Sequence, residues 1–487
     1  MTAGDKYSGL VRGTAFFLSG SLIAQFLLAI TGLSIARSFG ANDYGKYAAS
    51  FALAGAFAYA FSMGIDAVVP REIARETWPA SVTYMSYILP AILWGIVLSV
   101  FLISLGSLLG YSSDVMRLFV LVTPIVAVRS LSGLARSALR GIERMDLDAV
   151  IQVFSAFLVL ICVGITIHMV STITSVTMAM LFADVISMLI CLIVAWRLTG
   201  SSFAFDGQIL KSLMGKALPL GITFAIIGFN WRFDTIILSL FRSEGEVGLY
   251  SAAFGVVTFL GAASLVSGAL LPRLSRLDAA NDAGFQILWE IGLRYILIIG
   301  LGITVIACFF APDLLNMLYG PDYSGAVPIM KILGLTLVFL FVNRFLWHAL
   351  IAKGRQNSVL VSALFSSATM ILFSFVLVPE FGGSGSGFVA IIRDVSLTLV
   401  LLLFAAKEDL PLPSPKLIVS VMIAAVLMFI SLQLLGAQRG YLYALVVLPC
   451  SLVVYVGVLI FLGSIKSEEL MAIYSSLRLR SRHSLPN

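Results

Sequence analysis

The stretch "FGANDYGKYAASF" (39–51) returns in altered form as "RSEGEVGLYSAAF" (242–254). Both copies follow a long apolar segment. Aligned with a shift of 203 residues, the identical pairs are Gly45 with Gly248, Tyr47 with Tyr250, Ala49 with Ala252, and Phe51 with Phe254. Internal similarity of this kind indicates that the chain is built from two related halves.

Two further landmarks repeat in the same order. "VVPREIAR" (68–75) has its counterpart in "LLPRLSRL" (270–277), and "ALRGIERM" (138–145) has its counterpart in "LIAKGRQN" (350–357). With an even number of membrane spans in each half, the halves have the same orientation, which makes this a parallel repeat. Transporters with such repeats bind substrate near the bilayer midplane, where the halves meet.

The composition predicts that most of the chain lies in a membrane. Of 487 residues, 60% are hydrophobic and only 11% are charged, whereas a soluble domain has about 25% charged residues. A single soluble core also stops growing beyond roughly 250–300 residues. We therefore expect an all-α polytopic membrane protein, in which the first apolar stretch, 13–36, is a retained helix and not a signal peptide.

A spanning helix needs about 20 mostly apolar residues, and fourteen stretches qualify. They are 13–36, 44–67, 84–109, 115–138, 149–170, 173–196, 217–241, 247–271, 287–311, 326–351, 357–378, 384–406, 416–435 and 441–463. The repeat predicts an N-terminal lobe of six spans over 1–200 and a C-terminal lobe of six spans over 201–410. A proline-rich break, "KEDLPLPSPK" (407–416), sets off two appended spans and a basic tail over 411–487.

The positive charges predict the orientation. Of the 31 Lys and Arg residues, 21 lie in the two tails and the even-numbered loops, and six lie in the odd-numbered loops. Because Lys and Arg favour the cytoplasmic side, both termini should be cytoplasmic. The net charge of +6 mostly reflects this topology and does not predict nucleic-acid binding, which needs a contiguous basic face. The four cysteines and three histidines are scattered, so we expect no metal and no resident cofactor.

Three segments resemble a known group. They are "GTAFFLSGSLIAQFLLAITGLSIARSFGANDYGKYAAS" (13–50), "PREIAR" (70–75) and "SALRGIERMD" (137–146). With them the chain resembles the polysaccharide-unit flippases, the O-antigen or Wzx type, of the MOP exporter superfamily. The resemblance covers nearly the whole length and implies two six-helix bundles facing each other in a V, with two additional helices.

The resemblance also implies a function. Such a flippase moves an undecaprenyl-diphosphate-linked oligosaccharide from the inner to the outer leaflet of the bacterial cytoplasmic membrane, by alternating access, for surface polysaccharide biosynthesis. The implied partners are this lipid-linked glycan, the membrane lipids and the polysaccharide polymerase machinery.

Four arginines lie inside predicted spans: Arg129, Arg232, Arg344 and Arg393. An arginine at the bilayer centre costs about 2.5–3.5 kcal/mol, so these residues should face protein or an aqueous cavity. Arginine remains charged in a low dielectric and binds phosphate oxygens through two parallel hydrogen bonds. The candidate substrate-binding residues are Arg232, Arg344, Arg129, Asn230, Asn343, His348, Trp231 and Arg37.

Arg232 has two interpretations, as a ligand of anionic cargo or as a clamp paired with Asp66, Asp184 or Asp234. Asn230 and Asp234 share a helical face, while Arg232 is rotated from both by about 200°, so the three converge only if the helix is irregular there. Adjacent Arg393 and Asp394, and Glu290 and Arg294 at spacing i, i+4, are interpreted as local ion pairs.

Asp66, Asp184 and Asp234 are the acidic residues well inside spans 1–11, and they are the candidates for coupling to a proton or a sodium ion. One alternative is a multidrug–cation antiporter of the same superfamily, which would need a titrating carboxylate, commonly in the first span, where this chain has none. A membrane glycosyltransferase or a scaffold without transport activity are further alternatives. No Asp/Glu/His cluster occurs in a loop, so we expect no enzymatic activity.

Overall fold

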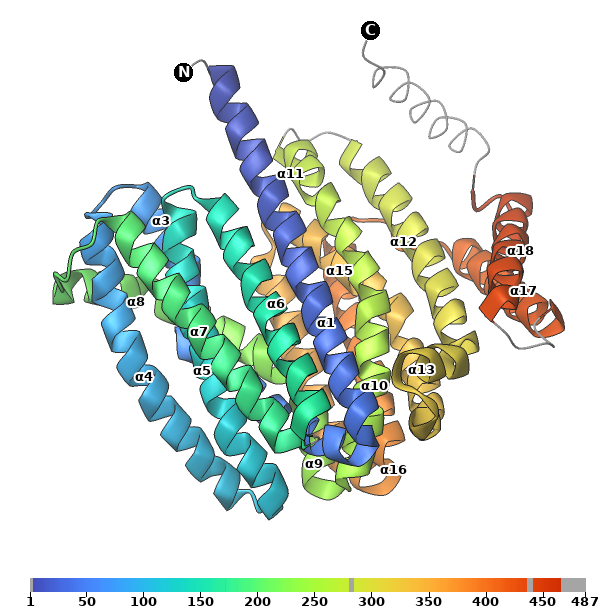
Figure 1. The fold of residues 1–487 in the computed structure, drawn as a ribbon. Helices are drawn as coiled ribbons and strands as arrows, with labels where there is room; N and C mark the ends of the chain where they lie inside the picture. The colour runs from blue at the N-terminus through green and yellow to red at the C-terminus, as the bar shows by residue number, and fades with distance from the viewer. Residues whose placement is uncertain (1–2, 171, 280–283, 436–440, 466–487) are drawn as a thin grey trace, which may run out of the picture. The chain divides into compact units, whose positions relative to one another are not determined.

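The computed structural model describes residues 3–170, 172–279, 284–435 and 441–465, and all regular structure within them is helical (Figure 1). The longer helices are α1 (Ala3–Ala56), α4 (Ala80–Leu108), α5 (Ser113–Gly141), α6 (Met145–Val170), α7 (Ile173–Thr199), α8 (Gly207–Asn230), α10 (Glu244–Gly261), α12 (Gly284–Phe309), α15 (Thr336–Ala352), α16 (Gln356–Lys407), α17 (Pro415–Leu435) and α18 (Tyr441–Phe461). The shorter elements are α2 (Ala58–Ser62), α3 (Ile65–Ala74), α9 (Phe233–Phe241), η1 (Ala262–Leu270), α11 (Leu271–Ala279), α13 (Ala311–Tyr319), η2 (Pro321–Ala326) and α14 (Val327–Gly334).

Eleven helices in the described part of the chain are long and apolar enough to cross a membrane. The chain is therefore an all-α, multi-pass membrane protein, as predicted. The predicted spans fall on helical segments but not one span to one helix, and the predicted count of fourteen is not confirmed. Span 13–36 and the first part of span 44–67 lie in α1, which is kinked at Gly40, and span 44–67 continues through α2 into α3. Spans 357–378 and 384–406 both lie in α16, which is kinked at Gly382. Both glycines have positive φ, 72° and 57°, a conformation that glycine adopts without the steric cost of a Cβ.

The helices form two compact units. The N-terminal unit comprises Met1–Ala252 with Asn316–Tyr323 and Val378–Ser386. The C-terminal unit comprises the segments Ala253–Leu315, Ser324–Leu377 and Gly387–Asn487. The division at residues 200 and 410 into two lobes and an appended pair of helices stays a prediction. The predicted basic end, "SLRLRSRHSLPN" (476–487), lies outside the described residues.

Buried aromatic residues hold the N-terminal unit together. Tyr84 and Tyr87 of α4 are almost completely buried, and their hydroxyl groups donate to the carbonyl oxygens of Leu192 and Leu134, each at 3.1 Å. A buried hydroxyl without a partner would cost free energy. These two bonds therefore link α4 to α7 and α5 at a fixed position.

The repeated glycines of the N-terminal unit lie directly against each other. A Cβ added at Gly45 would overlap the carbonyl oxygen of Glu244, and one added at Gly248 would overlap the carbonyl oxygen of Ala41. The shift of 203 residues that relates Gly45 to Gly248 also relates Ala41 to Glu244. The contact is thus reciprocal, as a two-fold relation between two similar elements requires. Only residues without side chains allow α1 and α10 to approach this closely.

In the C-terminal unit, α12 carries contacts to the segment before α17 and to α18. Trp289 of α12 is buried, and its Nε1 donates to the carbonyl oxygen of Pro411 at 2.9 Å. Farther along α12, the carbonyl oxygen of Ile298 accepts from the hydroxyl of Tyr455 on α18 at 2.8 Å. These two bonds hold the proline-rich segment and α18 on α12.

Candidate functional site

The N-terminal unit contains a cavity of about 180 Å³ among α1, α5, α6 and α7. Its polar lining residues are Ser21, Gln25, Arg129, Ser132, Arg136, Gln152, Ser155, Asp184 and Ser187. These polar side chains lie on otherwise apolar helices and line a cavity inside the protein. Exposure to lipid would leave their polar groups without hydrogen-bond partners. The cavity therefore provides hydroxyl, amide and guanidinium groups within the predicted spans.

Arg129 and Asp184 form an ion pair at this cavity. The Nε of Arg129 donates to Oδ2 of Asp184 at 2.9 Å. The side chain of Asp184 is 7% exposed, and that of Arg129 is 35% exposed. Because only Nε of the guanidinium is hydrogen-bonded to the carboxylate, the group keeps donor capacity for a further oxygen ligand. The sequence offered Asp184 as a partner of Arg232, and the structure corrects this: its partner is Arg129.

A second charge network lies beside the first and was missed in the sequence. Asp148 is completely buried; its carboxylate lies 3.4 Å from Arg136 and 3.8 Å from Arg140. It also accepts from Nε2 of Gln152 at 2.9 Å. The sequence feature that could have revealed this network is the i, i+4 spacing of Asp148 and Gln152, which places both side chains on one face of α6.

The chain is broken where Asn230, Trp231 and Arg232 follow one another. Helix α8 ends at Asn230, and α9 begins at Phe233 with Arg232 as its N-cap. The helix is thus irregular here, which is the condition that the sequence set for Asn230, Arg232 and Asp234 to converge. Trp231 is 43% exposed, and Arg232 is exposed as well.

The side chain of Arg232 forms no hydrogen bond or ion pair with any residue that the structure describes. Its Nε lies 3.7 Å from the position that a Cβ on Gly55 would occupy. Asp234 is buried; its carboxylate accepts from the Tyr250 hydroxyl and, at 2.7 Å, from the backbone N–H of Thr235. The clamp between Arg232 and a carboxylate, one of the two interpretations from the sequence, is therefore absent from the described residues.

Two other candidates of the N-terminal unit lie apart from the cavity lining. Asp66 lies in the first turn of α3, and its Oδ1 is buried without a hydrogen-bond partner in the described part of the chain. Arg37 lies on α1, three residues before the kink at Gly40, with an exposed side chain.

In the C-terminal unit, α15 carries Asn343, Arg344 and His348. Arg344 is half-buried and makes no ion pair or hydrogen bond with the described residues through its side chain. His348 Nδ1 lies 3.3 Å from Oγ of Ser267. Arg344 is thus a second intramembrane cation without a carboxylate partner among the residues described.

Asn343 faces a different neighbour. Its Nδ2 donates to the carbonyl oxygen of Asp394 at 3.0 Å, and its Oδ1 accepts from Thr398 at 2.7 Å. Both ends of the amide therefore bind α16. The predicted local pair of Arg393 with Asp394 is confirmed at 2.9 Å. No group of three or more metal-ligating side chains occurs in the described ranges.

The chain belongs to the polysaccharide biosynthesis protein family, whose model matches residues 10–278. A putative O-antigen transporter of Shigella flexneri is 23% identical over 414 residues, which cover 80% of this chain and 96% of that protein. The capsular polysaccharide biosynthesis protein CapF of Staphylococcus aureus is 25% identical over 178 residues, or 36% of this chain. That match spans 45% of CapF, less than half of its length.

Solved structures share the fold. The lipid II flippase MurJ, in an inward closed conformation, has a TM-score of 0.75 at 16% identity, over 93% of this chain and 99% of MurJ. An inward-facing multidrug transporter of the MATE family has a TM-score of 0.65 at 14% identity, over 80% of this chain and 98% of that protein. At these identities the likeness shows a shared fold. These likenesses are to transporters and not to enzymes, as the sequence led us to expect.

Proposed function

We propose that the chain moves an undecaprenyl-diphosphate-linked oligosaccharide from the inner to the outer leaflet of the bacterial cytoplasmic membrane for surface polysaccharide biosynthesis. The observation that supports this most is the pair of intramembrane arginines without carboxylate partners in the described chain, Arg232 and Arg344. The family membership supports a role in polysaccharide biosynthesis. The Shigella relative, named as an O-antigen transporter, supports transport as that role.

Cations without a described carboxylate partner fit this cargo for a physical reason. An arginine near the bilayer centre costs about 2.5–3.5 kcal/mol, and neither Arg232 nor Arg344 has a carboxylate partner among the described residues that would offset such a cost. A diphosphate carries about two negative charges and several acceptor oxygens, which guanidinium groups bind through charge-assisted hydrogen bonds. Binding of the cargo would therefore remove an electrostatic penalty that the empty protein carries.

The remaining candidates take secondary roles in this proposal. Exposed Trp231 and neighbouring Asn230 at the helix break suit a sugar, which binds aromatic faces and amides. Arg129 can contribute through guanidinium nitrogens that do not bind Asp184, and Arg37 can attract the anionic headgroup. Asn343 and His348 orient α15 through their contacts with α16 and Ser267, and thereby position Arg344.

We propose alternating access as the mechanism, with both termini cytoplasmic, so that a site open to the inside captures the headgroup and later faces outward. A polymerase that consumes the exported unit would be the partner outside. Asp184 is the favoured coupling residue, because its carboxylate contacts a cavity-lining arginine, and proton or sodium binding there would change the charge of the pair. Asp66 and Asp234 are the other two candidates.

A multidrug–cation antiporter is the alternative, since MATE transporters share the fold. Arg232 and Arg344, which have no carboxylate partner among the described residues, favour an anionic cargo over an organic cation, because like charges repel at short range in a low dielectric. Deleting the gene should therefore cause a lipid-linked glycan to accumulate in the host. Loss of that glycan, or its unchanged level together with greater drug sensitivity, would contradict the proposal.

Substitutions at Arg232 test its role as a ligand. Lysine keeps the charge and loses the planar fork, so Arg232→Lys should retain part of the transport. Arg232→Gln should abolish most transport at normal protein abundance, because no described carboxylate depends on this arginine. Arg393→Gln is the matched control: it removes an intramembrane charge that is paired with Asp394, so it should lower stability more than transport per molecule. Normal export by Arg232→Gln would exclude Arg232 from the site.

A further inference from the structure

The cavity among α1, α5, α6 and α7 has a size and a lining that suit a small polar group. On α1 its lining residues recur at spacing i, i+3, i+4 and i+7, which places them on one helical face; they are Ser21, Ala24, Gln25 and Leu28. The volume of about 180 Å³ is below the roughly 300–1,000 Å³ of pockets that hold drug-sized ligands. The cavity therefore has room for one small group, such as a single sugar ring, and not for a whole oligosaccharide.

The cavity extends from the middle of the predicted spans toward one end of them. Gln25 lies at the centre of the first predicted span, and Arg129 lies close to the centre of the fourth. Ser155 and Arg136 lie nearer the ends that the positive charges predict to be cytoplasmic. Gln25 is exposed, and a polar side chain at this depth is expected to face protein or water and not lipid. We therefore expect the cavity to open to an aqueous passage.

Both cations of the lining have a carboxylate partner. Arg129 binds Asp184 at 2.9 Å, and Arg136 lies 3.4 Å from the buried carboxylate of Asp148. A carboxylate at this distance repels an incoming phosphate and offsets the attraction of its arginine. The guanidinium N–H groups that do not bind a carboxylate can still donate to a neutral hydroxyl. The lining therefore favours an uncharged, hydroxyl-rich group over a diphosphate, unlike the two arginines that we assign to the diphosphate.

Two further polar side chains of the lining are available for hydrogen bonds. Gln25 and Ser155 make no hydrogen bond with the described residues through their side chains. Gln152, by contrast, accepts from the Ser21 hydroxyl at 3.1 Å and donates to Asp148 at 2.9 Å, so it fixes the wall of the cavity. A sugar hydroxyl is both a donor and an acceptor, as are the amide of Gln25 and the hydroxyl of Ser155. These two side chains therefore match the chemistry of a sugar.

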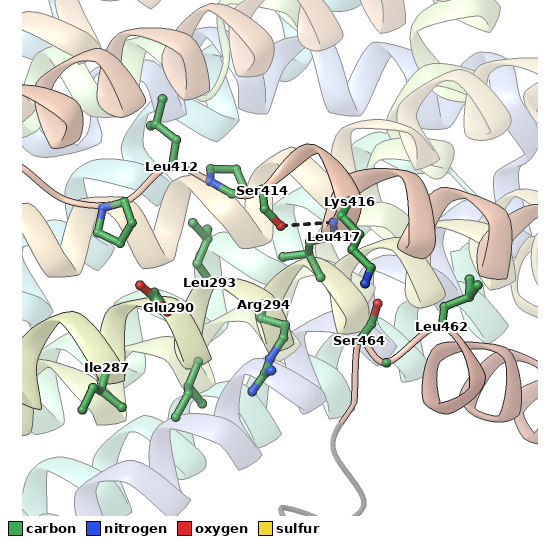
Figure 2. A pocket seen from close by; sticks show the side chains of 14 residues that line it. Ile287, Glu290, Leu293, Arg294, Leu412, Ser414, Lys416, Leu417, Leu462 and Ser464 are labelled. Carbon is green, nitrogen blue, oxygen red and sulfur yellow. Dashed lines mark hydrogen bonds between the residues drawn. The ribbon is translucent and has the colours of Figure 1, made fainter.

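A larger pocket, of about 530 Å³, lies in the C-terminal unit and differs in its position (Figure 2). Its lining residues 411–414 precede α17, and 462–464 follow α18, so they are at the ends of spans. Glu290 and Arg294 also line it; the ion pair that the sequence suggested does not join these two residues, and the guanidinium of Arg294 lies over the ring of Tyr295 at 5.3 Å. Because transporters with parallel repeats bind substrate near the midplane, we do not assign this larger pocket to the cargo.

We propose that the cavity among α1, α5, α6 and α7 binds one uncharged sugar residue of the lipid-linked glycan through its hydroxyl groups. The amide of Gln25 and the hydroxyl of Ser155 bind the sugar directly, and the N–H groups of Arg129 that do not bind Asp184 donate to further sugar hydroxyls. This inference rests on the proposed function and divides the headgroup between two kinds of site. The sugar binds where the charges are paired, and the diphosphate binds the arginines without a described carboxylate partner.

The test measures the binding of two lipids by the purified full-length protein in detergent, with native mass spectrometry as the readout. One lipid is the undecaprenyl-diphosphate glycan isolated from the deletion strain, and the other is undecaprenyl diphosphate without sugar. Loss of one neutral hydrogen bond weakens binding roughly 2- to 12-fold. Gln25→Ala and Ser155→Ala should each weaken binding of the glycan lipid by this factor and leave the affinity for undecaprenyl diphosphate unchanged. Neither substitution deprives a described residue of a hydrogen bond, so both variants should fold.

The matched control is Gln433→Ala, which removes an exposed glutamine of α17 that lines neither pocket and should leave both affinities unchanged. Wild-type affinity of Gln25→Ala and Ser155→Ala for the glycan lipid would overturn the inference and leave the proposed function intact. An equal loss for both lipids would also overturn it, because the two residues would then not distinguish the sugar from the diphosphate. If the wild type bound neither lipid, the proposed function itself would fail, and the inference with it.

Discussion

Replacing Gly45 by alanine should separate two helices that now touch. The added Cβ would overlap the carbonyl oxygen of Glu244, and that atom belongs to helix backbone, which cannot rotate away as a side chain would. Helices α1 and α10 must therefore move apart. Overpacking of this kind costs about 1–3 kcal/mol, or roughly 5- to 150-fold in the equilibrium between folded and unfolded protein. Gly248→Ala should have the same effect, because the contact is reciprocal.

Thermal unfolding in detergent, followed by the fraction of protein that stays monodisperse, measures the effect. The control is Gly32→Ala in the same helix, where a Cβ meets nothing within 4 Å. Alanine is favoured over glycine inside a helix by about 1 kcal/mol, so this variant should be as stable as wild type or more so. The double variant at residues 45 and 248 should lose less than the sum of the single losses, because either methyl group already separates the helices. A Gly45→Ala protein as stable as Gly32→Ala would refute the reasoning.

Two further predictions concern topology and the buried ion pair. Cysteines introduced at Asn42 and Gly141 should be labelled by impermeant reagents from outside and from inside the cell, respectively, and the reverse pattern would overturn the orientation and the direction of transport. Arg129→Gln should lower protein abundance, because the carboxylate of Asp184 stays buried without its cation at a cost of about 3–5 kcal/mol, and adding Asp184→Asn should restore abundance. Normal abundance of the single variant, measured by immunoblot of membranes, would show that the pair does not stabilise the fold.

The fold was largely predictable because the lipid environment constrains it strongly. Long apolar stretches must be helical, since a bilayer supplies no partners for backbone polar groups. The break near Arg232 was not predicted: the sequence showed only that Asn230, Arg232 and Asp234 could converge if the helix were irregular there. The number of separate helices was harder to predict from the sequence. At Gly40, a glycine with positive φ, one kinked helix continues from one predicted span into the next. Neither the composition nor the hydrophobic periodicity predicts the backbone angle at such a glycine.

The partners of the buried charges could not be predicted in the same way. Arg129 and Asp184 are 55 residues apart, and their contact depends on how α5 and α7 are rotated about their axes. The apolar pattern of a membrane helix fixes this rotation weakly, because lipid and protein core are both apolar. The repeated glycines are visible in the sequence, but the direct contact of Gly45 with its counterpart Gly248 is seen only once the packing of α1 on α10 is known.

Translocation by the purified protein is the most direct test of the proposed function. Undecaprenyl-diphosphate glycan from the deletion strain would be reconstituted into vesicles with wild-type protein or with the Arg232→Gln/Arg344→Gln variant at equal density. A glycan-cleaving enzyme added outside then measures the fraction of exposed cargo. Wild-type vesicles should expose nearly all of the glycan, and the variant only the share that began in the outer leaflet. Equal protection in wild-type vesicles and in protein-free vesicles would contradict the claim that this chain moves the lipid-linked glycan.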